Sequence, residues 1–303
     1  MIMTPTTAAD RLDVRERALG AYLGFAVGDA LGAPVEFLTE QEIRKQYGEL
    51  REMVGGGWLR LRVGQVTDDT QMSLALGDAM LQACGWSLPT AAEHFLAWYR
   101  SKPVDIGNTC RRGIARYLRD GSLVSPFSEG DAGNGAVMRN LPVILATLGD
   151  DETFARATLE QCHFTHHHPL SDAAALALGH MARVLLGGHG LSRARAIADG
   201  LVSEYRIFHF EPCPKQCTGY VVDTVQTVLH GFFNSTSFEE CLLGIVNRGG
   251  DADTNGALAG MLAGARYGAA AIPPRWLQKL ERPVREAIVR QVDALLLLAD
   301  LGA

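Results

Sequence analysis

Four oxygen-bearing side chains, Thr67, Asp68, Asp69 and Thr70, stand in a row just before an apolar run of helical spacing that begins at Met72. One such residue is enough to cap a helix, because a hydroxyl or carboxylate accepts hydrogen bonds from the free N–H groups there. Two acids flanked by two threonines exceed that need. Clustered carboxylate and hydroxyl oxygens are also the ligands that Mg²⁺ and Mn²⁺ prefer. The stretch therefore fits a helix cap or a hard-cation site.

A second cluster of the same kind lies far down the chain, where Asp251, Asp253 and Thr254 open another apolar helical run. Neither cluster has the twelve-residue loop and closing Glu of an EF-hand, which excludes that calcium motif. Two such clusters can share one site. The pair favours a single centre for hard cations, built from two distant segments.

Three segments, in this order, resemble the ADP-ribosylglycohydrolase family: residues 28–36, 67–70 and 250–254. The resemblance covers about residues 18–268, and it implies an all-helical fold with a two-metal centre. By that resemblance, Glu36 is a catalytic residue beside two Mn²⁺ or Mg²⁺ ions. The residues implied as metal ligands are Thr67, Asp68, Asp69, Asp251, Asp253 and Thr254.

Residues 105–113 and 215–220 look most like the branch of this family that reactivates dinitrogenase reductase in nitrogen-fixing bacteria. In that branch the acid matching Asp105 faces the scissile bond, where a carboxylate could pair with the substrate's guanidinium. The simpler alternative is that Asp105 caps the helix that follows it. The resemblance makes Asp105 a second catalytic residue.

A glycine-rich loop at residues 128–139 feeds an expected helix, an arrangement whose N–H groups can cradle phosphates but that also serves as a plain turn. The resemblance implies that this loop contacts diphosphate or ribose. It also places His166 in the pocket wall, and suggests that Tyr220 stacks on adenine instead of packing in the core. The substrate-binding residues expected on this basis are Asp29, Asn108, Asp131, Gly133, Asn134, Gly135, His166 and Tyr220.

The bulk properties describe an ordinary globular protein. The chain has 303 residues, 47% hydrophobic and 20% charged, and no Pro/Ser-rich linker, so we expect one domain over residues 1–303, with 1–13 flexible. A net charge of −6 argues against nucleic-acid binding driven by phosphate contacts. The N-terminus is charged where a signal peptide is apolar, and no apolar run of membrane-spanning length is evident, so a cytoplasmic protein with reduced cysteines is expected.

Apolar residues recur with helical spacing through most of the chain, and no segment shows sustained alternation. The predicted fold is all-α, a single-domain orthogonal helical bundle of the ADP-ribosylglycohydrolase type. Residues 51–66 are expected to form a short hairpin or an irregular loop. The predicted helices are 14–31, from 68 to about 81, 89–100, 109–119, 136–148, 152–162, 171–186, 192–205, 218–233, 238–246, 254–267 and 284–301.

Two of these helices carry glycines at every fourth position: 20, 24, 28 and 32, then 256, 260, 264 and 268. Each interior glycine costs a helix about 1 kcal/mol relative to alanine. The stripes either let two backbones approach closely, which would bring Asp29 and Glu36 near Asp251 and Asp253, or merely supply small residues in a crowded bundle. Both explanations remain open at this point.

The function implied is a hydrolase that removes ADP-ribose from an arginine of a target protein, expected to be dinitrogenase reductase. Two rivals are a hydrolase of serine-linked ADP-ribose or O-acetyl-ADP-ribose, and a crystallin-like structural or binding relative. The two intact acid clusters disfavour the latter. The resemblance also implies a PII-type signalling partner and reversible membrane association through partners; the chain is expected to be a monomer.

Overall fold

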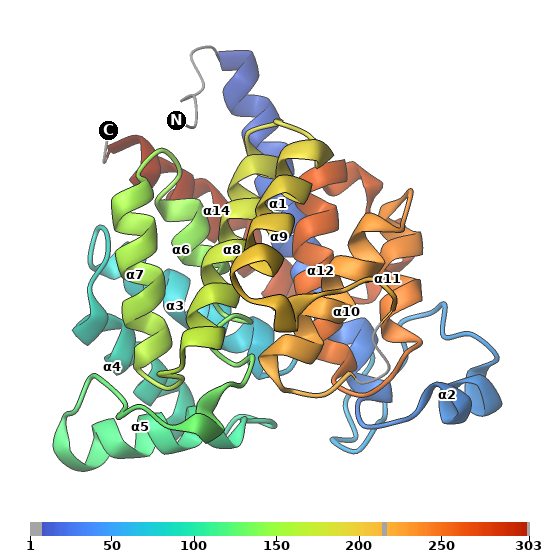
Figure 1. The fold of residues 1–303 in the computed structure, drawn as a ribbon, viewed down its shortest axis with the longest axis horizontal. Coiled ribbons are helices and arrows are strands. Elements are labelled where there is room, and N and C mark those ends of the chain that lie inside the picture. Colours follow the sequence, from blue (N-terminus) through green and yellow to red (C-terminus); the bar gives the residue numbers. More distant parts are fainter. Residues whose placement is uncertain (1–7, 214–216, 302–303) are drawn as a thin grey trace.

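The computed structural model describes residues 8–213 and 217–301, and within them it contains fourteen α-helices and no β-strand. This confirms the all-α prediction. Figure 1 shows the helices packed around α1 and α12, which lie side by side near the centre. The helices are α1 (Ala8–Gly32), α2 (Glu40–Tyr47), α3 (Asp68–Gln82), α4 (Leu88–Arg100), α5 (Asn108–Asp120), α6 (Leu141–Ala146), α7 (Asp151–His163), α8 (Pro169–Leu186), α9 (Leu191–Glu204), α10 (Val221–Phe233), α11 (Phe238–Val246), α12 (Ala252–Tyr267), α13 (Pro274–Lys279) and α14 (Arg282–Leu301).

The glycine stripes of α1 and α12 face each other. A Cβ atom placed on Gly28 would lie 2.0 Å from the carbonyl oxygen of Gly256, and one on Gly24 would lie 2.4 Å from that of Gly260. Only glycine allows this approach, so the first of the two explanations holds. Gly268 also lies against α1, where a Cβ on Gly20 would be 2.6 Å from its carbonyl carbon, and it ends α12 with a φ of 78°.

Replacing Gly28 with alanine is expected to destabilise the protein by about 3 kcal/mol, because the new methyl group meets backbone that cannot rotate away and the helices must separate. Gly200 is the matched control: it lies inside α9 with open space around its Cβ position. Gly200→Ala should stabilise by up to about 1 kcal/mol through helix propensity. Urea unfolding of both variants measures the difference. A Gly28→Ala variant as stable as the wild type would contradict the close approach.

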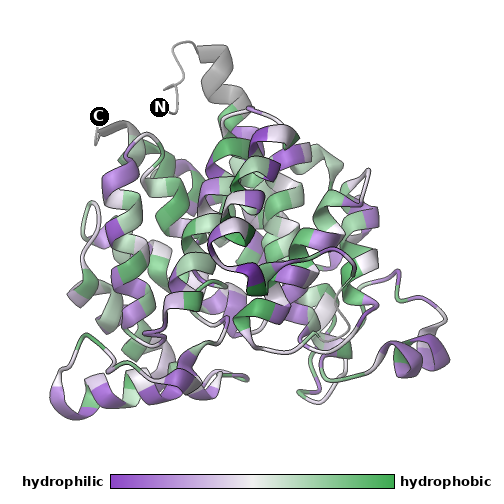
Figure 2. Cartoon of the chain, in the orientation of Figure 1, coloured by the Kyte–Doolittle hydropathy of each residue, from purple (hydrophilic) through white to green (hydrophobic). Residues whose placement is uncertain are grey.

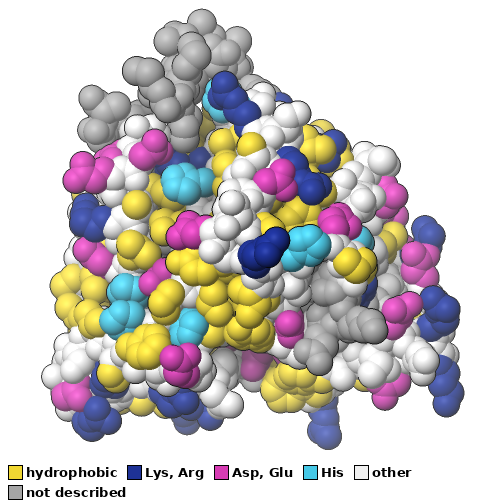
Figure 3. All heavy atoms as spheres, viewed as in Figure 1, with side chains coloured by type: hydrophobic (Ala, Val, Ile, Leu, Met, Phe, Trp, Pro, Cys, Tyr) yellow, Lys and Arg dark blue, Asp and Glu magenta, His cyan; other side chains and the backbone are white. Residues whose placement is uncertain are grey.

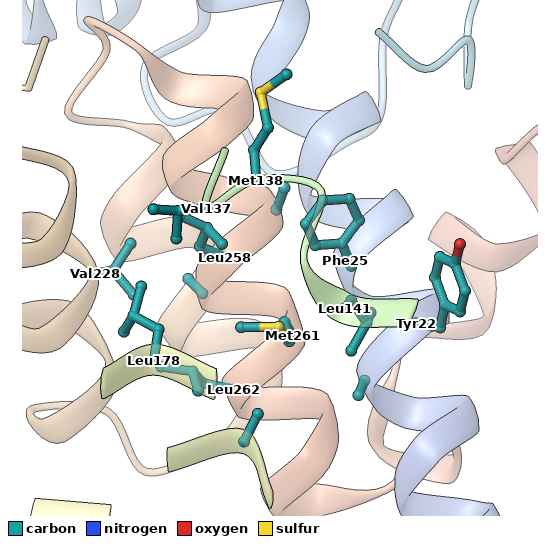
Figure 4. Close-up of a cluster of buried hydrophobic side chains, with 14 of the residues drawn as sticks. Tyr22, Phe25, Val137, Met138, Leu141, Leu178, Val228, Leu258, Met261 and Leu262 are labelled. Atoms are coloured by element: carbon teal, nitrogen blue, oxygen red, sulfur yellow. The ribbon is translucent and has the colours of Figure 1, made fainter. Parts of the chain in front are cut away.

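The core is built around α12. Figure 4 shows side chains from α1, α8, α10 and the segment before α6 meeting against Leu258, Met261 and Leu262 of α12. Figure 2 shows that the helices carry both hydrophobic and hydrophilic residues, with hydrophobic residues concentrated toward the interior. Figure 3 shows acidic and basic side chains interspersed among hydrophobic ones on the face in view. The central position of α12 fixes the acids at its N-terminus relative to the rest of the bundle.

One segment was misjudged from sequence. Residues 14–35 are long and apolar enough to cross a membrane, contrary to the expectation that no run approaches that length. Of its most apolar window, 94% is buried inside the protein. The apolar length reflects a helix surrounded by protein on all sides, as expected for a central core helix.

Several boundaries also differ. The helix predicted at 136–148 covers only Leu141–Ala146, because Pro142 has no N–H to donate to residue 138 and therefore stands in the first turn. The short helices α2 and α13 were not predicted. Residues 51–66 form an irregular loop with one isolated bridge, Gly56 to Leu61. Helix α1 begins before residue 14, and residues 1–7 of the terminus predicted to be flexible lie outside the described residues.

Candidate metal and glycohydrolase site

A cavity of about 620 Å³ opens where the N-termini of α3, α5 and α12 converge. It brings together most of the residues singled out from the sequence. Those lining it are Glu36, Asp68, Asp69, Asp105, Asn108, Gly133, Asn134, Gly135, His166, Asp251, Asp253 and Thr254. Asp29, Thr67, Asp131 and Tyr220 are not among its lining residues.

Asp29 organises the first acid cluster from behind the cavity. Its fully buried carboxylate accepts hydrogen bonds from the hydroxyl and backbone N–H of Thr67, at 3.0 and 3.0 Å, and from those of Thr70, at 2.6 and 3.2 Å. Thr67 is the N-cap of α3, with its hydroxyl accepting from the Asp69 N–H. The simple capping explanation therefore fits Thr67 and Asp29. It leaves Asp68 and Asp69 free to face the cavity.

The second cluster touches the first. The Thr254 hydroxyl donates to Asp69 Oδ2 at 3.3 Å, which joins the start of α12 to the start of α3. Asp251 is the N-cap residue of α12 but its side chain makes no cap hydrogen bond; the Asn134 amide donates to it instead. Two segments far apart in sequence thus share one acidic site.

Glu36 lies with the α12 acids. One ligand oxygen from each of Glu36, Asp251 and Asp253 falls within 4.8 Å of the others. The residues that follow Glu36 are hydrogen-bonded to Gly250, just before α12. The Phe37 N–H donates to the Gly250 carbonyl at 2.7 Å, and the Gly250 N–H donates to the Leu38 carbonyl at 2.9 Å. Glu36 is therefore placed as either a metal ligand or a neighbouring proton carrier.

Asp105 does not cap α5. The N-cap of that helix is Gly107, which makes no side-chain cap bond, and its N–H donates to Asp68 Oδ2 at 3.0 Å. Asp105 accepts one hydrogen bond, from the Ile106 N–H at 2.8 Å, and lines the cavity. The geometry removes the simpler explanation for this acid and leaves its carboxylate beside the site.

Burial and mutual repulsion disfavour ionisation of the clustered acids. Burial is the largest cause throughout: it raises the pKa of Glu36 to about 8 and the pKa of Asp68 to about 7. The pKa values of Asp69 and Asp253 are raised well above their usual range, with neighbouring carboxylates adding to the effect of burial. Without cations the site is an unfavourable concentration of negative charge.

Two atoms in the site lack a partner that a cation would supply. Asp69 Oδ1 and Asp253 Oδ1 are buried and accept no hydrogen bond from the described residues. Buried carboxylate oxygens are normally hydrogen-bonded or bound to metal. The donor set consists of carboxylate and hydroxyl oxygens with no cysteine or histidine among the grouped ligands, which suits Mg²⁺ or Mn²⁺ better than zinc. The residues present fit a hard divalent cation.

Removal of divalent metal should make stability depend on pH. The pKa values of Asp29, Asp68 and Glu36 are about 6, 7 and 8 in the fold, above unfolded values near 4. The folded state therefore keeps these protons to a higher pH than the unfolded state does. The stability that the protonated acids contribute below pH 4 is lost as pH rises through 6 to 8. Tm of chelator-treated protein should fall by on the order of 5 °C between pH 5 and pH 8.

Added Mn²⁺ should raise that Tm more at pH 8 than at pH 5, because ligand carboxylates bind metal only when deprotonated. Differential scanning fluorimetry of the chelated protein across this range measures both effects. A Tm that rises with pH in the absence of metal would contradict the assignment of these acids to one buried group.

The glycine loop forms another wall, although it does not open a helix directly. A Cβ on Gly135 would lie 2.7 Å from the His166 ring, so the loop and the histidine pack without room for a side chain. His166 is 3% exposed, and burial, with Arg139 and Arg112 nearby, keeps its pKa well below the usual value. His166 is therefore a neutral wall residue, its Nδ1 paired with the Thr165 hydroxyl at 2.8 Å.

Two residues expected to bind substrate do not line the cavity, although Tyr220 pairs with the lining residue Gly133 through an isolated bridge. The Asp131 carboxylate pairs with Arg112, and Tyr220 is 37% exposed at the N-cap of α10. In return the cavity includes Phe37, Trp58 and Arg111, which sequence analysis did not assign to the site. The signal for Trp58 was present, because it directly follows three glycines in an irregular loop.

An all-α bundle with buried acids around one cavity is suited to hydrolysis assisted by hard cations. Comparison with known proteins agrees. The family model for ADP-ribosylglycohydrolase matches residues 10–302, a longer stretch than the motifs indicated. The ADP-ribosyl-[dinitrogen reductase] glycohydrolase of Rhodospirillum rubrum is 57% identical over 288 residues, 95% of this chain and 98% of its own.

The ADP-ribosylarginine hydrolase Tri1 of Serratia proteamaculans is 32% identical, over 93% of this chain and 80% of its own. A solved structure described as an ADP-ribosylglycohydrolase-related protein complex superposes with a TM-score of 0.84 at 34% identity, covering 95% of this chain and 99% of that one. The chain therefore belongs to the ADP-ribosylglycohydrolase family and is a glycohydrolase enzyme. The resemblance drawn from its motifs is confirmed.

Proposed function

We propose that the protein removes ADP-ribose from a modified arginine of a target protein. The observation that carries this proposal is the position of the Asp105 carboxylate, which lines the cavity and caps no helix. It lies near enough to Glu36 and Asp68 for its charge to raise the pKa of both. A negative group there suits a guanidinium leaving group, which is positively charged and planar. The 57% identity to a glycohydrolase of dinitrogen reductase supports the same linkage.

The chain's residues have distinct tasks in this proposal. Asp105 pairs with the guanidinium and orients the arginine side of the bond. Glu36, whose pKa burial raises to about 8, holds or accepts a proton beside the reacting carbon. Asn108, Gly133, Asn134, Gly135 and His166 line the wall for ADP-ribose, and Asp29 holds the start of α3 in place.

Two Mn²⁺ or Mg²⁺ ions are proposed as cofactors, held by Asp68, Asp69, Asp251, Asp253 and Thr254; Thr67 supports Asp69 from behind. When bound, such ions supply positive charge that orients ribose hydroxyls and lowers the pKa of water. The support is the donor set and the two unpartnered oxygens of Asp69 and Asp253.

Dinitrogenase reductase is the proposed target, supported by the name and high identity of the Rhodospirillum rubrum relative. The test is release of free ADP-ribose from four substrates with the Mn²⁺-loaded enzyme: arginine-modified dinitrogenase reductase, another arginine-modified protein, a serine-modified protein and O-acetyl-ADP-ribose. Release from the arginine-linked proteins alone is expected. Release from the serine-linked or O-acetyl substrate alone would favour the rival hydrolase, and no release from any substrate would favour a non-enzymatic relative.

The remaining proposals rest on composition and sequence pattern for the domain and the location, and on the family resemblance for the partners. They are a single domain acting as a cytoplasmic monomer, a PII-type signalling protein as partner, and membrane association through such partners. Co-purification of the cognate PII protein at high ADP, with sedimentation of the complex, tests them. Recovery of the enzyme alone would remove the partner proposal.

A further inference from the structure

Two large aromatic side chains stand exposed at the cavity. Phe37 is 66% exposed and Trp58 is 53% exposed, and both line the cavity. Their ring centroids are 5.4 Å apart with an interplanar angle of 49°. Exposed aromatic pairs beside a cavity are a common feature of binding sites, because large apolar side chains otherwise pack inside.

The backbone holds both residues in this exposed position. Phe37 has a φ of 64°, a left-handed conformation rare for a residue of this size, and its N–H is bonded to the Gly250 carbonyl at 2.7 Å. Trp58 follows Gly57, where a Cβ would lie 2.9 Å from the Pro34 Cα. Tertiary contacts of the backbone thus fix the positions from which the two side chains extend.

Trp58 also touches the acid group directly. Its indole N–H donates to Glu36 Oε2 at 2.6 Å, and Glu36 shares its cluster with Asp251 and Asp253. The N–H edge of the Trp58 ring therefore points at the acid cluster, while much of the ring surface is exposed. A carboxylate next to an aromatic face favours a cationic group such as guanidinium over the neutral adenine ring.

We infer that Phe37 and Trp58 form the subsite for the arginyl side chain of the modified protein, with the guanidinium against the aromatic faces. The inference rests on the proposed function and deepens it, because it identifies what distinguishes an arginine linkage from a neutral serine linkage. Aromatic faces attract guanidinium through their quadrupoles, most strongly in tryptophan. Trp58 has a second task, which is to position Glu36 through its N–H.

Two substitutions separate these tasks. Phe37→Leu keeps apolar volume but removes a π face, and should raise KM for an ADP-ribosylarginine peptide by about three- to tenfold while kcat changes little. Trp58→Phe keeps a π face but removes the N–H, and should lower kcat by about tenfold with a smaller change in KM. In both variants the Kd of free ADP-ribose, measured by calorimetry, should stay within about twofold of wild type.

Trp86→Phe is the matched control, because Trp86 also donates its indole N–H to a glutamate, Glu160, at 2.6 Å, and does not line the cavity. It should leave kcat and KM unchanged. Phe37→Tyr should restore the KM that Phe37→Leu loses. An unchanged KM in Phe37→Leu, or a parallel loss of ADP-ribose affinity that would indicate adenine binding, overturns the inference.

A binding measurement keeps this test separate from the proposed activity. Agmatine, which carries a free guanidinium, should quench tryptophan fluorescence in protein loaded with ADP-ribose. N-carbamoylputrescine, which keeps the ammonium of agmatine but has a neutral urea in place of the guanidinium, should not. The agmatine response should be absent in Trp58→Phe and weakened in Phe37→Leu. If arginine-linked substrates are not cleaved but this response is found, the proposed function fails and the guanidinium subsite stands. An equal response in wild type and both variants overturns the subsite alone.

Discussion

Asp253→Asn is expected to lose both bound metal and turnover, the latter by on the order of 10³-fold or more. Asp253 is 2% exposed, and its Oδ1 has no hydrogen-bond partner among the described residues. The substitution removes a negative charge and replaces one ligand oxygen with an amide. Metal content by mass spectrometry and release of ADP-ribose, measured on the same preparation, check the two losses together.

Stability separates this explanation from simple misfolding. In metal-free protein, burial and the charges of Glu36, Asp251 and Asp69 raise the pKa of Asp253 far above its usual value. A neutral asparagine removes that repulsion, so the metal-free variant should be at least as stable as metal-free wild type. Asp199→Asn, which removes a surface ion pair with Arg195 on α9, should retain metal and activity. Full metal occupancy in Asp253→Asn would show that Asp253 is not a ligand.

The acids could be located from the sequence because the members of each cluster lie close together in the chain. Asp68 and Asp69 are adjacent in the chain, and Asp251 and Asp253 are separated by one residue, each pair at the start of a helix. Their meeting in space depends on close packing of α1 with α12, which the glycine stripes indicated but did not decide. The spacing of the glycines shows that each helix allows another backbone to come close. Only the position of the facing helix shows that this approach occurs.

For Asp29, the sequence indicated that the residue lies near the site but not that its carboxylate supports the start of α3. It lies in a motif of the family and close to the site, yet its partners are the N–H and hydroxyl groups of Thr67 and Thr70, in another helix. A buried carboxylate that supports a helix and one that faces a ligand have the same local sequence. The distinction is made by hydrogen bonds between distant segments.

The same limit applies to Phe37 and Trp58. Each sits in an irregular loop, and its exposure follows from contacts made with Gly250 and Pro34. Hydrophobic periodicity says nothing about such residues, because they belong to no helix. The three glycines before Trp58 indicated an irregular backbone there, but they did not indicate what the Trp58 side chain contacts.

Asp105→Ala should lower turnover by about 10²- to 10⁴-fold and leave metal content unchanged. Asp105 lines the cavity and accepts a hydrogen bond from the Ile106 N–H, and it is not among the residues proposed to hold the ions. Loss of its carboxylate removes the charge proposed to pair with the guanidinium. Steady-state kinetics with an arginine-linked substrate, alongside metal analysis, measure both properties.

Asp105→Asn distinguishes charge from loop structure. The asparagine side chain can still accept the Ile106 N–H bond, at 2.8 Å in the wild type, so the loop before α5 should keep its conformation. If the negative charge is what acts on the guanidinium, Asp105→Asn should be nearly as inactive as Asp105→Ala. Recovery of activity in the asparagine variant would mean that Asp105 serves only to shape the loop. Loss of metal from either variant would instead make Asp105 a ligand, and the division of roles among these acids would have to be redrawn around it.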